Sequence, residues 1–201
     1  MALKTFVKIS NVSSLSDARY CAGMMVNAIG FNIDPISDGH ISVEDYTEIT
    51  DWVAGVDFVG EFEKADLAQL KEAIKSYAIT FIQISDVNLV EQVNLLGYPI
   101  IFKLNINTAA ELDKLKSTLS YLDELVKIVI IKSENEDLFE ELESRIGYYN
   151  CNFRLLKGFG FSDMQHLHKF PGLELEATKE DKPGNKDYGQ VMDVLEAIEE
   201  D

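Results

Sequence analysis

Seven charged side chains lie inside, or at the end of, segments whose apolar residues predict β-strands. They are the lysines Lys8, Lys103, Lys132 and Lys157 and the glutamates Glu61, Glu174 and Glu176. The lysines could bind an anion, and Lys132 could form a Schiff base with a carbonyl compound. Buried charges need partners of opposite sign, and amines and carboxylates occur here in similar numbers. We therefore expect these lysines and glutamates mainly to neutralise one another.

Ser10 and the histidines are the other residues that could do chemistry. Ser10 ends the first predicted strand, but a serine hydroxyl needs a neighbouring base to become a nucleophile, and no histidine is placed to activate it. His40 lies in a predicted loop, where it could contact a ligand. His166 and His168 are two residues apart, so they do not share a helix face, and no carboxylate completes a ligand set. The sequence therefore indicates no metal site.

Short apolar segments alternate along the chain with segments of helical periodicity. The predicted strands cover residues 6–11, 27–33, 56–61, 78–84, 99–104, 126–131, 152–156 and 173–175. The predicted helices cover residues 14–25, 42–54, 66–77, 87–96, 108–123, 134–148, 163–170 and 187–199. Alternating units of this kind give a parallel sheet with right-handed crossovers, and eight of them can close into a barrel.

The fold class expected from this pattern is α/β, as one (β/α)8 TIM barrel over residues 1–201. An open doubly wound sheet is the alternative, but eight units in so short a chain favour the barrel. Three helix starts carry a hydroxyl side chain followed three residues later by an acid, at Ser14, Ser42 and Thr108. Barrel enzymes keep their functional groups at the C-terminal ends of the strands, which is where Ser10 is predicted to lie.

The composition is that of a globular chain with a strong excess of acid. Hydrophobic residues make up 46% of the 201 residues, and the formal net charge is −17. This charge argues against general binding to nucleic acid or anionic membranes, and no apolar run is long enough to cross a bilayer. We expect no secretory signal, and we expect Cys21 and Cys151 to be reduced thiols. These features predict a cytoplasmic protein, either a monomer or a homodimer.

Five motifs, in order along the chain, resemble those of the phosphoribosylanthranilate isomerase family. The stretch Val7–Ala18 resembles that family's opening, VKICGITxxEDA. Ala28–Phe31 matches its AxGF motif, and Val59–Phe62 is similar to its VGVF motif. Gln83 falls where the family has a glutamine in the fourth strand, and Pro183–Asp187 matches its PGxKD motif. The resemblance covers essentially the whole chain with compatible spacing.

The resemblance implies a (β/α)8 barrel that performs an Amadori rearrangement of a phosphoribosylated aminobenzoate in tryptophan synthesis, without a cofactor. Members of the family use a cysteine at the end of strand one as general base. They use an aspartate at the end of strand six as general acid. They bind the substrate phosphate on glycine-rich backbone after strands seven and eight, a site common to many such barrels.

This sequence departs from the family at most of those positions. Ser10 replaces the base, and Lys132 replaces the acid. Gly39 stands in place of a substrate-binding arginine, and Glu176 follows strand eight where the family has a phosphate-binding segment. The resemblance thus gives Ser10 and Lys132 as the catalytic positions, with their identities changed. The candidate substrate-binding residues are Gly39, His40, Gln83, Lys103, Lys157, Gly158, Glu176 and Thr178.

Two interpretations of these departures remain open. A thiol can be tuned to act as a base, whereas a serine hydroxyl stays neutral without a partner, which favours a catalytically degenerate barrel retained for binding or regulation. The alternative is an active but divergent isomerase of phosphoribosylanthranilate or another phosphosugar that uses Ser10 and Lys132. Under either interpretation the expected ligand is a small anionic metabolite.

Overall fold

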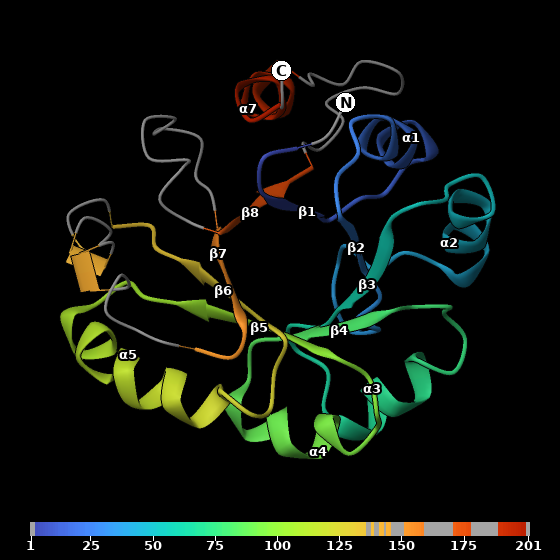
Figure 1. Cartoon of the computed structure of the whole chain (residues 1–201). Coiled ribbons are helices and arrows are strands. Elements are labelled where there is room, and N and C mark those ends of the chain that lie inside the picture. Colours follow the sequence, from blue (N-terminus) through green and yellow to red (C-terminus); the bar gives the residue numbers. More distant parts are fainter. Residues whose placement is uncertain are drawn as a thin grey trace.

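The computed structural model describes residues 3–135, 138, 141–142, 144–145, 151–158, 171–177 and 189–199. Within them, parallel strands β1 to β8 form a closed barrel in which β8 pairs with β1. Figure 1 shows the barrel with helices around its outside. The predicted (β/α)8 barrel is therefore confirmed.

The strands are short and match the predicted ones in order. They are β1 (Phe6–Ser10), β2 (Ala28–Asn32), β3 (Asp57–Glu61), β4 (Phe81–Ile84), β5 (Ile100–Asn105), β6 (Ile128–Lys132), β7 (Arg154–Gly158) and β8 (Gly172–Glu176). β4 begins three residues later than the predicted 78–84, and β7 both begins and ends two residues later than 152–156. Residues 157 and 158, which follow the predicted strand 152–156, are therefore the last two residues of β7.

The described helices lie outside the strands. They are α1 (Leu15–Gly23), α2 (Val43–Thr50), α3 (Leu67–Ala73), the 3₁₀ helix η1 (Val87–Leu89), α4 (Val90–Asn94), α5 (Ala109–Leu122) and α7 (Gly189–Ala197). The predicted helix 163–170 and much of 134–148 lie outside the described residues. Among the described helices, none combines the length and the hydrophobicity that crossing a membrane requires.

Side-chain caps fix where the helices begin. Ser14 accepts a hydrogen bond from the Asp17 N–H, and Ser42 accepts one from the Asp45 N–H. At Thr108 the cap is reciprocal, because Glu111 also accepts from the Thr108 N–H. Each cap satisfies a backbone donor that has no partner within the helix. The three predicted helix starts are thus correct.

The side chains alternate along each strand between two cores. Residues on the outer face pack against the helices in a large apolar cluster that includes Val7, Ile9, Ile131 and Leu173. Residues on the inner face form a smaller cluster of Ala28, Val59, Ile101, Ile128, Ile130 and Leu156. This inner cluster fills the N-terminal part of the barrel, while the inner positions near the C-terminal strand ends carry charge. The charged side chains near the C-terminal strand ends therefore lie together in the mouth of the barrel.

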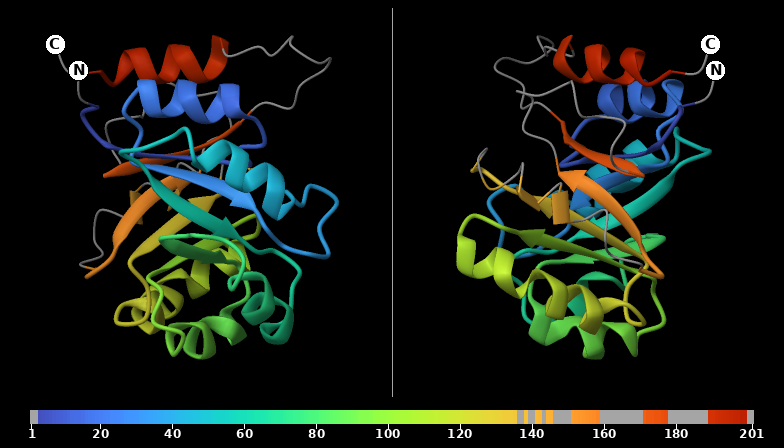
Figure 2. Two further views of the ribbon diagram at one scale, coloured as in Figure 1. Left: turned by 90° about the vertical axis from the view of Figure 1, so that its right-hand side faces the viewer. Right: turned by 60° about the vertical axis from the view of Figure 1, so that its left-hand side comes forward.

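The two ends of the described chain meet beside the junction of β1 and β8. Leu3 forms an antiparallel bridge with Glu199, and the Lys4 N–H donates to the Ile198 carbonyl at 2.8 Å. Figure 2 shows α7 alongside α1, over the strands of this junction. The helix layer thus covers the place where the first and last strands close the barrel.

Candidate functional site

Six charged residues meet inside the mouth of the barrel, and we call them the charged network. Its members alternate in sign, in the order Glu61, Lys8, Glu174, Lys103, Glu176 and Lys132. They come from β3, β1, β8, β5 and β6, all at inward-facing positions. The neutralisation of lysines by glutamates that the sequence predicted is confirmed for these six residues. Three ammonium groups face three carboxylates.

The inner half of the charged network is centred on Lys8, which is fully buried. Its ammonium group binds Glu61 at 2.5 Å, lies 3.5 Å from Glu174, and donates to the Ser10 hydroxyl. Ser10 in turn donates to Glu174 at 2.6 Å. The second oxygen of Glu61 accepts from the Asn11 N–H at 3.1 Å. All the charges at this depth are therefore paired and hydrogen-bonded, as burial requires.

The outer half of the charged network reaches the rim. Lys103 lies 3.3 Å from Glu174 and 3.5 Å from Glu176, and Lys132 lies 3.0 Å from Glu176. Lys103 is nearly buried, whereas the Glu176 side chain is 40% exposed. The network thus leads from the closed interior of the barrel to solvent.

The ionisation of these groups follows from their neighbours. Burial would raise the pKa of Glu174, but Lys8, Lys103 and the hydrogen bond from Ser10 hold this pKa below its ordinary value. Burial would likewise raise the pKa of Glu176, and Lys132 and Lys103 lower it overall. Burial would lower the pKa of Lys103, but the surrounding glutamates raise it above its usual value. Lys103 is therefore an ammonium and no candidate for amine nucleophile at neutral pH.

Two glycines make the space that the charged network occupies. A Cβ on Gly30 would lie 2.9 Å from the Lys8 ammonium and would overlap the Glu61 carboxylate. A Cβ on Gly158 would lie 3.0 Å from the Lys132 Cβ and 3.3 Å from a Glu174 oxygen. The glycine of the AxGF motif thus allows a long lysine and a glutamate to meet inside the barrel.

Ser10 is not arranged as a nucleophile. It is only 1% exposed, and its proton is donated to Glu174. Lys8 lies beside it, but a lysine can serve as the base for a serine only as a free amine, and Lys8 makes ion pairs with two carboxylates. Lys132 is likewise held in an ion pair with Glu176. The structure thus brings Ser10 and Lys132 to the barrel mouth, where Lys132 belongs to the charged network and Ser10 forms hydrogen bonds with two of its members.

A cavity of about 760 Å³ lies above the charged network and opens at the rim. Its polar lining includes Asn11, Ser13, Asn32, Ser37, Asp38, Gly39, Glu61, Glu63, Lys64, Gln83, Lys103 and Glu176. A smaller cavity of about 260 Å³ shares Glu63, Lys64, Gln83 and Lys103 with it. We call the larger one the mouth cavity. Its volume is in the range of small-molecule sites.

Asp34 holds two of the loops that form the wall of the mouth cavity. Its carboxylate is buried and accepts from the N–H groups of Glu63, Lys64 and Ala65 at 2.9, 2.6 and 3.0 Å. It also accepts from the Ile36 N–H at 3.1 Å. Burial would raise the pKa of Asp34, but these backbone hydrogen bonds lower it below its ordinary value. The loop after β2 is thereby fixed to the loop after β3.

The other candidate residues divide into those at the cavity and those away from it. Gly39 and Gln83 line the mouth cavity, and Gly158 faces the interior next to Lys132. His40 is exposed, with its Nε2 3.1 Å from the Tyr77 hydroxyl. Thr178 lies outside the described residues.

Lys157 does not face the barrel interior. It pairs laterally with Ile131 and Leu173, both of which belong to the outer apolar cluster, so its side chain points to the same outer face. The expectation that Lys157 contributes to the pocket is therefore corrected, because its side chain lies on the outer face of the barrel. Because β7 continues through residue 158, Lys157 lies within the strand, and its side chain points to the face opposite to that of Leu156 and Gly158.

The sequence did not single out Asp34, Glu63 or Lys64. Asp34 directly follows the predicted strand 27–33, and nothing in the sequence indicated that its carboxylate would bind the backbone of another loop. Glu63 and Lys64 directly follow the VGVF-like motif, and their position after a strand was the available signal.

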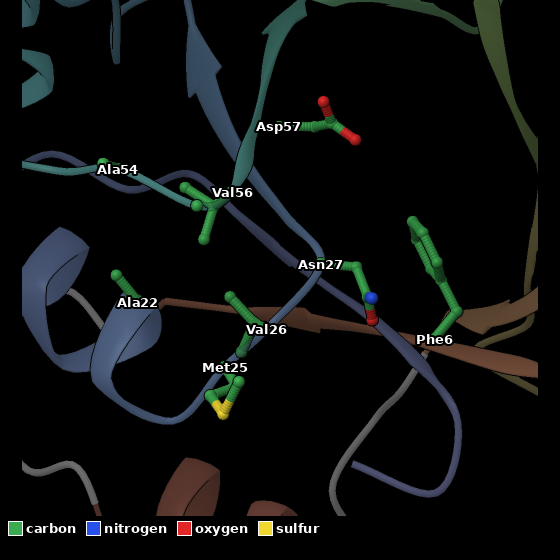
Figure 3. Close-up of a pocket in the computed structure, with 9 residues that line it drawn as sticks. Phe6, Ala22, Met25, Val26, Asn27, Ala54, Val56 and Asp57 are labelled. Atoms are coloured by element: carbon green, nitrogen blue, oxygen red, sulfur yellow. The ribbon is translucent and has the colours of Figure 1, made fainter. Parts of the chain in front are cut away.

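A second large cavity, of about 700 Å³, lies at the opposite end of the barrel. Figure 3 shows Phe6, Asn27 and Asp57 around it, at the N-terminal ends of the first three strands. Asp57 is the one charged residue of its described lining, and the Asn27 side-chain oxygen already accepts a hydrogen bond from the Val7 N–H at 2.8 Å. It therefore lacks the polar groups of the mouth cavity. No group of three or more metal-ligating side chains occurs among the described residues.

Comparison with solved structures places this barrel beside phosphoribosylanthranilate isomerases. The enzyme from Thermotoga maritima has a TM-score of 0.72 and 18% identity, covering 96% of each chain. TrpF from Jonesia denitrificans has a TM-score of 0.74 and 15% identity, also covering 96% of each chain. The enzyme from Thermus thermophilus has a TM-score of 0.73 and 16% identity, covering 96% of this chain and 97% of its own.

At these identities the likeness concerns the fold. An N-acetylneuraminic acid synthetase from Leptospira borgpetersenii, which is 11% identical, reaches a TM-score of 0.69 over 96% of this chain and 82% of its own. No family model and no curated protein sequence matches the chain. The barrel is thus shared with enzymes of more than one reaction, and the site itself must indicate the function.

Proposed function

We propose that this chain is a catalytically degenerate relative of the phosphoribosylanthranilate isomerases, a barrel retained for binding or regulation. The observation that carries this proposal concerns Ser10 and Lys132, the two positions that the resemblance gives as catalytic: Lys132 is paired within the charged network, and Ser10 is hydrogen-bonded to two of its members. Ser10 is also buried beneath it. The support is the geometry of the mouth together with the fold-level likeness to these isomerases.

The rearrangement requires a general base and a general acid, each typically worth about 10²–10⁴ in rate. A buried serine that donates its proton to Glu174 does not serve as the base. A lysine paired with Glu176 at 3.0 Å replaces the acid. Losing both groups removes most of the rate enhancement that proton transfer supplies.

The rim also argues against a phosphorylated substrate. A phosphate site in a barrel needs backbone N–H groups or cations with unused charge. Glu176 places a half-exposed carboxylate at the end of β8, where it offsets the charges of Lys103 and Lys132. A dianion would therefore meet a rim at which Lys103 and Lys132 already have counter-charges.

The activity of the purified chain tests this proposal. Conversion of phosphoribosylanthranilate is followed by the loss of its fluorescence, with an authentic isomerase as the positive control. We expect a rate indistinguishable from buffer and no growth of a tryptophan auxotroph that lacks the isomerase. Brisk conversion or near-normal growth would overturn the proposal. Loss of that conversion in Lys132→Met would then support the divergent isomerase that uses Ser10 and Lys132.

A further inference from the structure

The mouth cavity is lined by more acid than base. Its described lining contains the carboxylates of Asp38, Glu61, Glu63 and Glu176 but only the ammonium groups of Lys64 and Lys103. Lys103 already lies within 3.5 Å of both Glu174 and Glu176. The chain as a whole carries −17. The charged network is itself neutral, so the remaining charges of this lining are those of Asp38, Glu63 and Lys64. Both the lining and the whole chain are therefore net negative and favour cations over anions.

Gln83 adds an acceptor that lacks a donor. The residue is 4% exposed and lines both the mouth cavity and the smaller cavity beside it. Its side-chain oxygen is buried and has no hydrogen-bond partner within the described part of the chain. Leaving a buried carbonyl oxygen unpaired is unfavourable, and such groups are rare in folded proteins. A ligand that donates a hydrogen bond here would remove that cost.

The deeper carboxylates are already paired, so the ligand must find its counter-charge nearer the rim. Both oxygens of Glu61 are in use, one with Lys8 and one with the Asn11 N–H. Glu176 is likewise paired, with Lys132 and Lys103, whereas Glu63 lines the same cavity as Gln83 and forms no ion pair within the described part of the chain. A ligand group that donates a hydrogen bond to Gln83 therefore lies in the mouth cavity, whose wall also carries carboxylates.

We propose that the mouth cavity binds a small organic cation, whose protonated amine donates to the Gln83 side-chain oxygen and is balanced by Glu63. This inference rests on the proposed function, because it gives the ligand class of a barrel mouth that binds without isomerising. It also differs from the small anionic metabolite expected from the sequence. The cavity is large enough for a diamine or an amino sugar.

Isothermal titration calorimetry with putrescine tests the inference on the full-length chain. The neutral 1,4-butanediol and the anionic ribose 5-phosphate serve as comparison ligands. We expect putrescine to bind at one site, more tightly than either comparison ligand, and more weakly as salt is added. Tighter binding of ribose 5-phosphate, or no putrescine binding at millimolar concentration, would overturn the inference.

Two variants and one control test whether putrescine binds in the mouth cavity. Gln83→Met keeps the size of the side chain and removes the acceptor, so the putrescine Kd should rise about tenfold. The melting temperature of this variant should not fall, because an unpaired buried oxygen is removed. Glu63→Gln should raise the Kd about threefold. Glu48→Gln is the matched control, because it makes the same change in net charge on an exposed part of α2 that is absent from the described lining.

The outcomes separate this inference from the proposed function. Equal weakening by Glu63→Gln and Glu48→Gln would indicate nonspecific attraction by the acidic chain and overturn the inference. Putrescine binding that is unaffected by Gln83→Met would also overturn it. Neither result bears on the fluorescence assay, so a chain that fails to bind putrescine and fails to convert phosphoribosylanthranilate refutes only the ligand class.

Discussion

At the scale of single residues, Lys8 holds the interior of the barrel mouth together. Its ammonium group contacts Ser10, Glu61 and Glu174 without any exposure to solvent. A buried ion pair adds little net stability compared with apolar packing, because desolvation offsets the attraction. Removing one partner is different, because the remaining charges stay buried without compensation. Lys8 is therefore more important to the fold than the net strength of its ion pairs suggests.

Lys8→Met should lower the free energy of unfolding at neutral pH by about 3–5 kcal/mol, because two buried carboxylates lose their shared partner. Urea unfolding measures the change. Adding Glu174→Gln to this variant should recover part of the loss. The matched control Lys75→Met removes an exposed lysine that pairs with Glu72 on the surface, and it should leave stability nearly unchanged. Equal losses in Lys8→Met and Lys75→Met would contradict the buried role of Lys8.

At the scale of elements, Asp34 joins two loops that no strand pairing connects. Three consecutive N–H groups of the loop after β3 converge on one oxygen of its carboxylate. The loop after β2 supplies the carboxylate and a fourth N–H, from Ile36. These two loops carry Asp38, Glu63 and Lys64 into the wall of the mouth cavity. One side chain thus fixes the shape of the cavity on this side.

Asp34→Asn should lower the free energy of unfolding by about 1–3 kcal/mol at pH 7, because an amide cannot satisfy the converging donors. The pKa of Asp34 is depressed in the folded state, so the carboxylate stabilises the fold above its unfolded pKa. That stabilisation is lost as the pH falls through the folded value. The difference between wild type and variant should therefore be constant from pH 7 to 5 and shrink below about pH 4.

Denaturant unfolding across this pH range measures the prediction for Asp34. Asp38→Asn is the control, because Asp38 is an exposed acid in the same loop and should show little effect on stability. A difference that grows on acidification would contradict the proposed role of the Asp34 carboxylate.

At the scale of the whole molecule, paired and unpaired charges have opposite effects. The charged network is neutral and largely shielded from solvent, so salt screens it weakly. The excess of −17 is carried by the rest of the chain and favours expansion through self-repulsion. Stability should therefore respond to salt through the surface and not through the barrel mouth.

Raising the ionic strength from about 0.01 M to about 0.15 M shortens the screening length from about 30 Å to about 8 Å. Sodium chloride over this range should raise the melting temperature, by about 2–4 °C for each kcal/mol of repulsion removed. Differential scanning calorimetry measures the shift. A falling melting temperature would mean that attractive ion pairs outweigh the repulsion and would refute this account.

The alternation of apolar segments determined the barrel, because strand and helix periodicities are local properties of the chain. The helix starts at Ser14, Ser42 and Thr108 were also predictable, since a cap needs only neighbours within three residues. The sequence further indicated that lysines and glutamates would neutralise one another, because their numbers are similar and buried charges need partners.

Only the tertiary structure decided which charges meet. Lys8 and Glu174 are 166 residues apart and become neighbours because β8 pairs with β1 when the barrel closes. Lys157 was expected in the pocket, but the continuation of β7 turns it to the outer face, since neighbouring strand residues point in opposite directions. The Asp34 contacts and the unpaired oxygen of Gln83 likewise depend on strand register and loop packing, which no local pattern encodes.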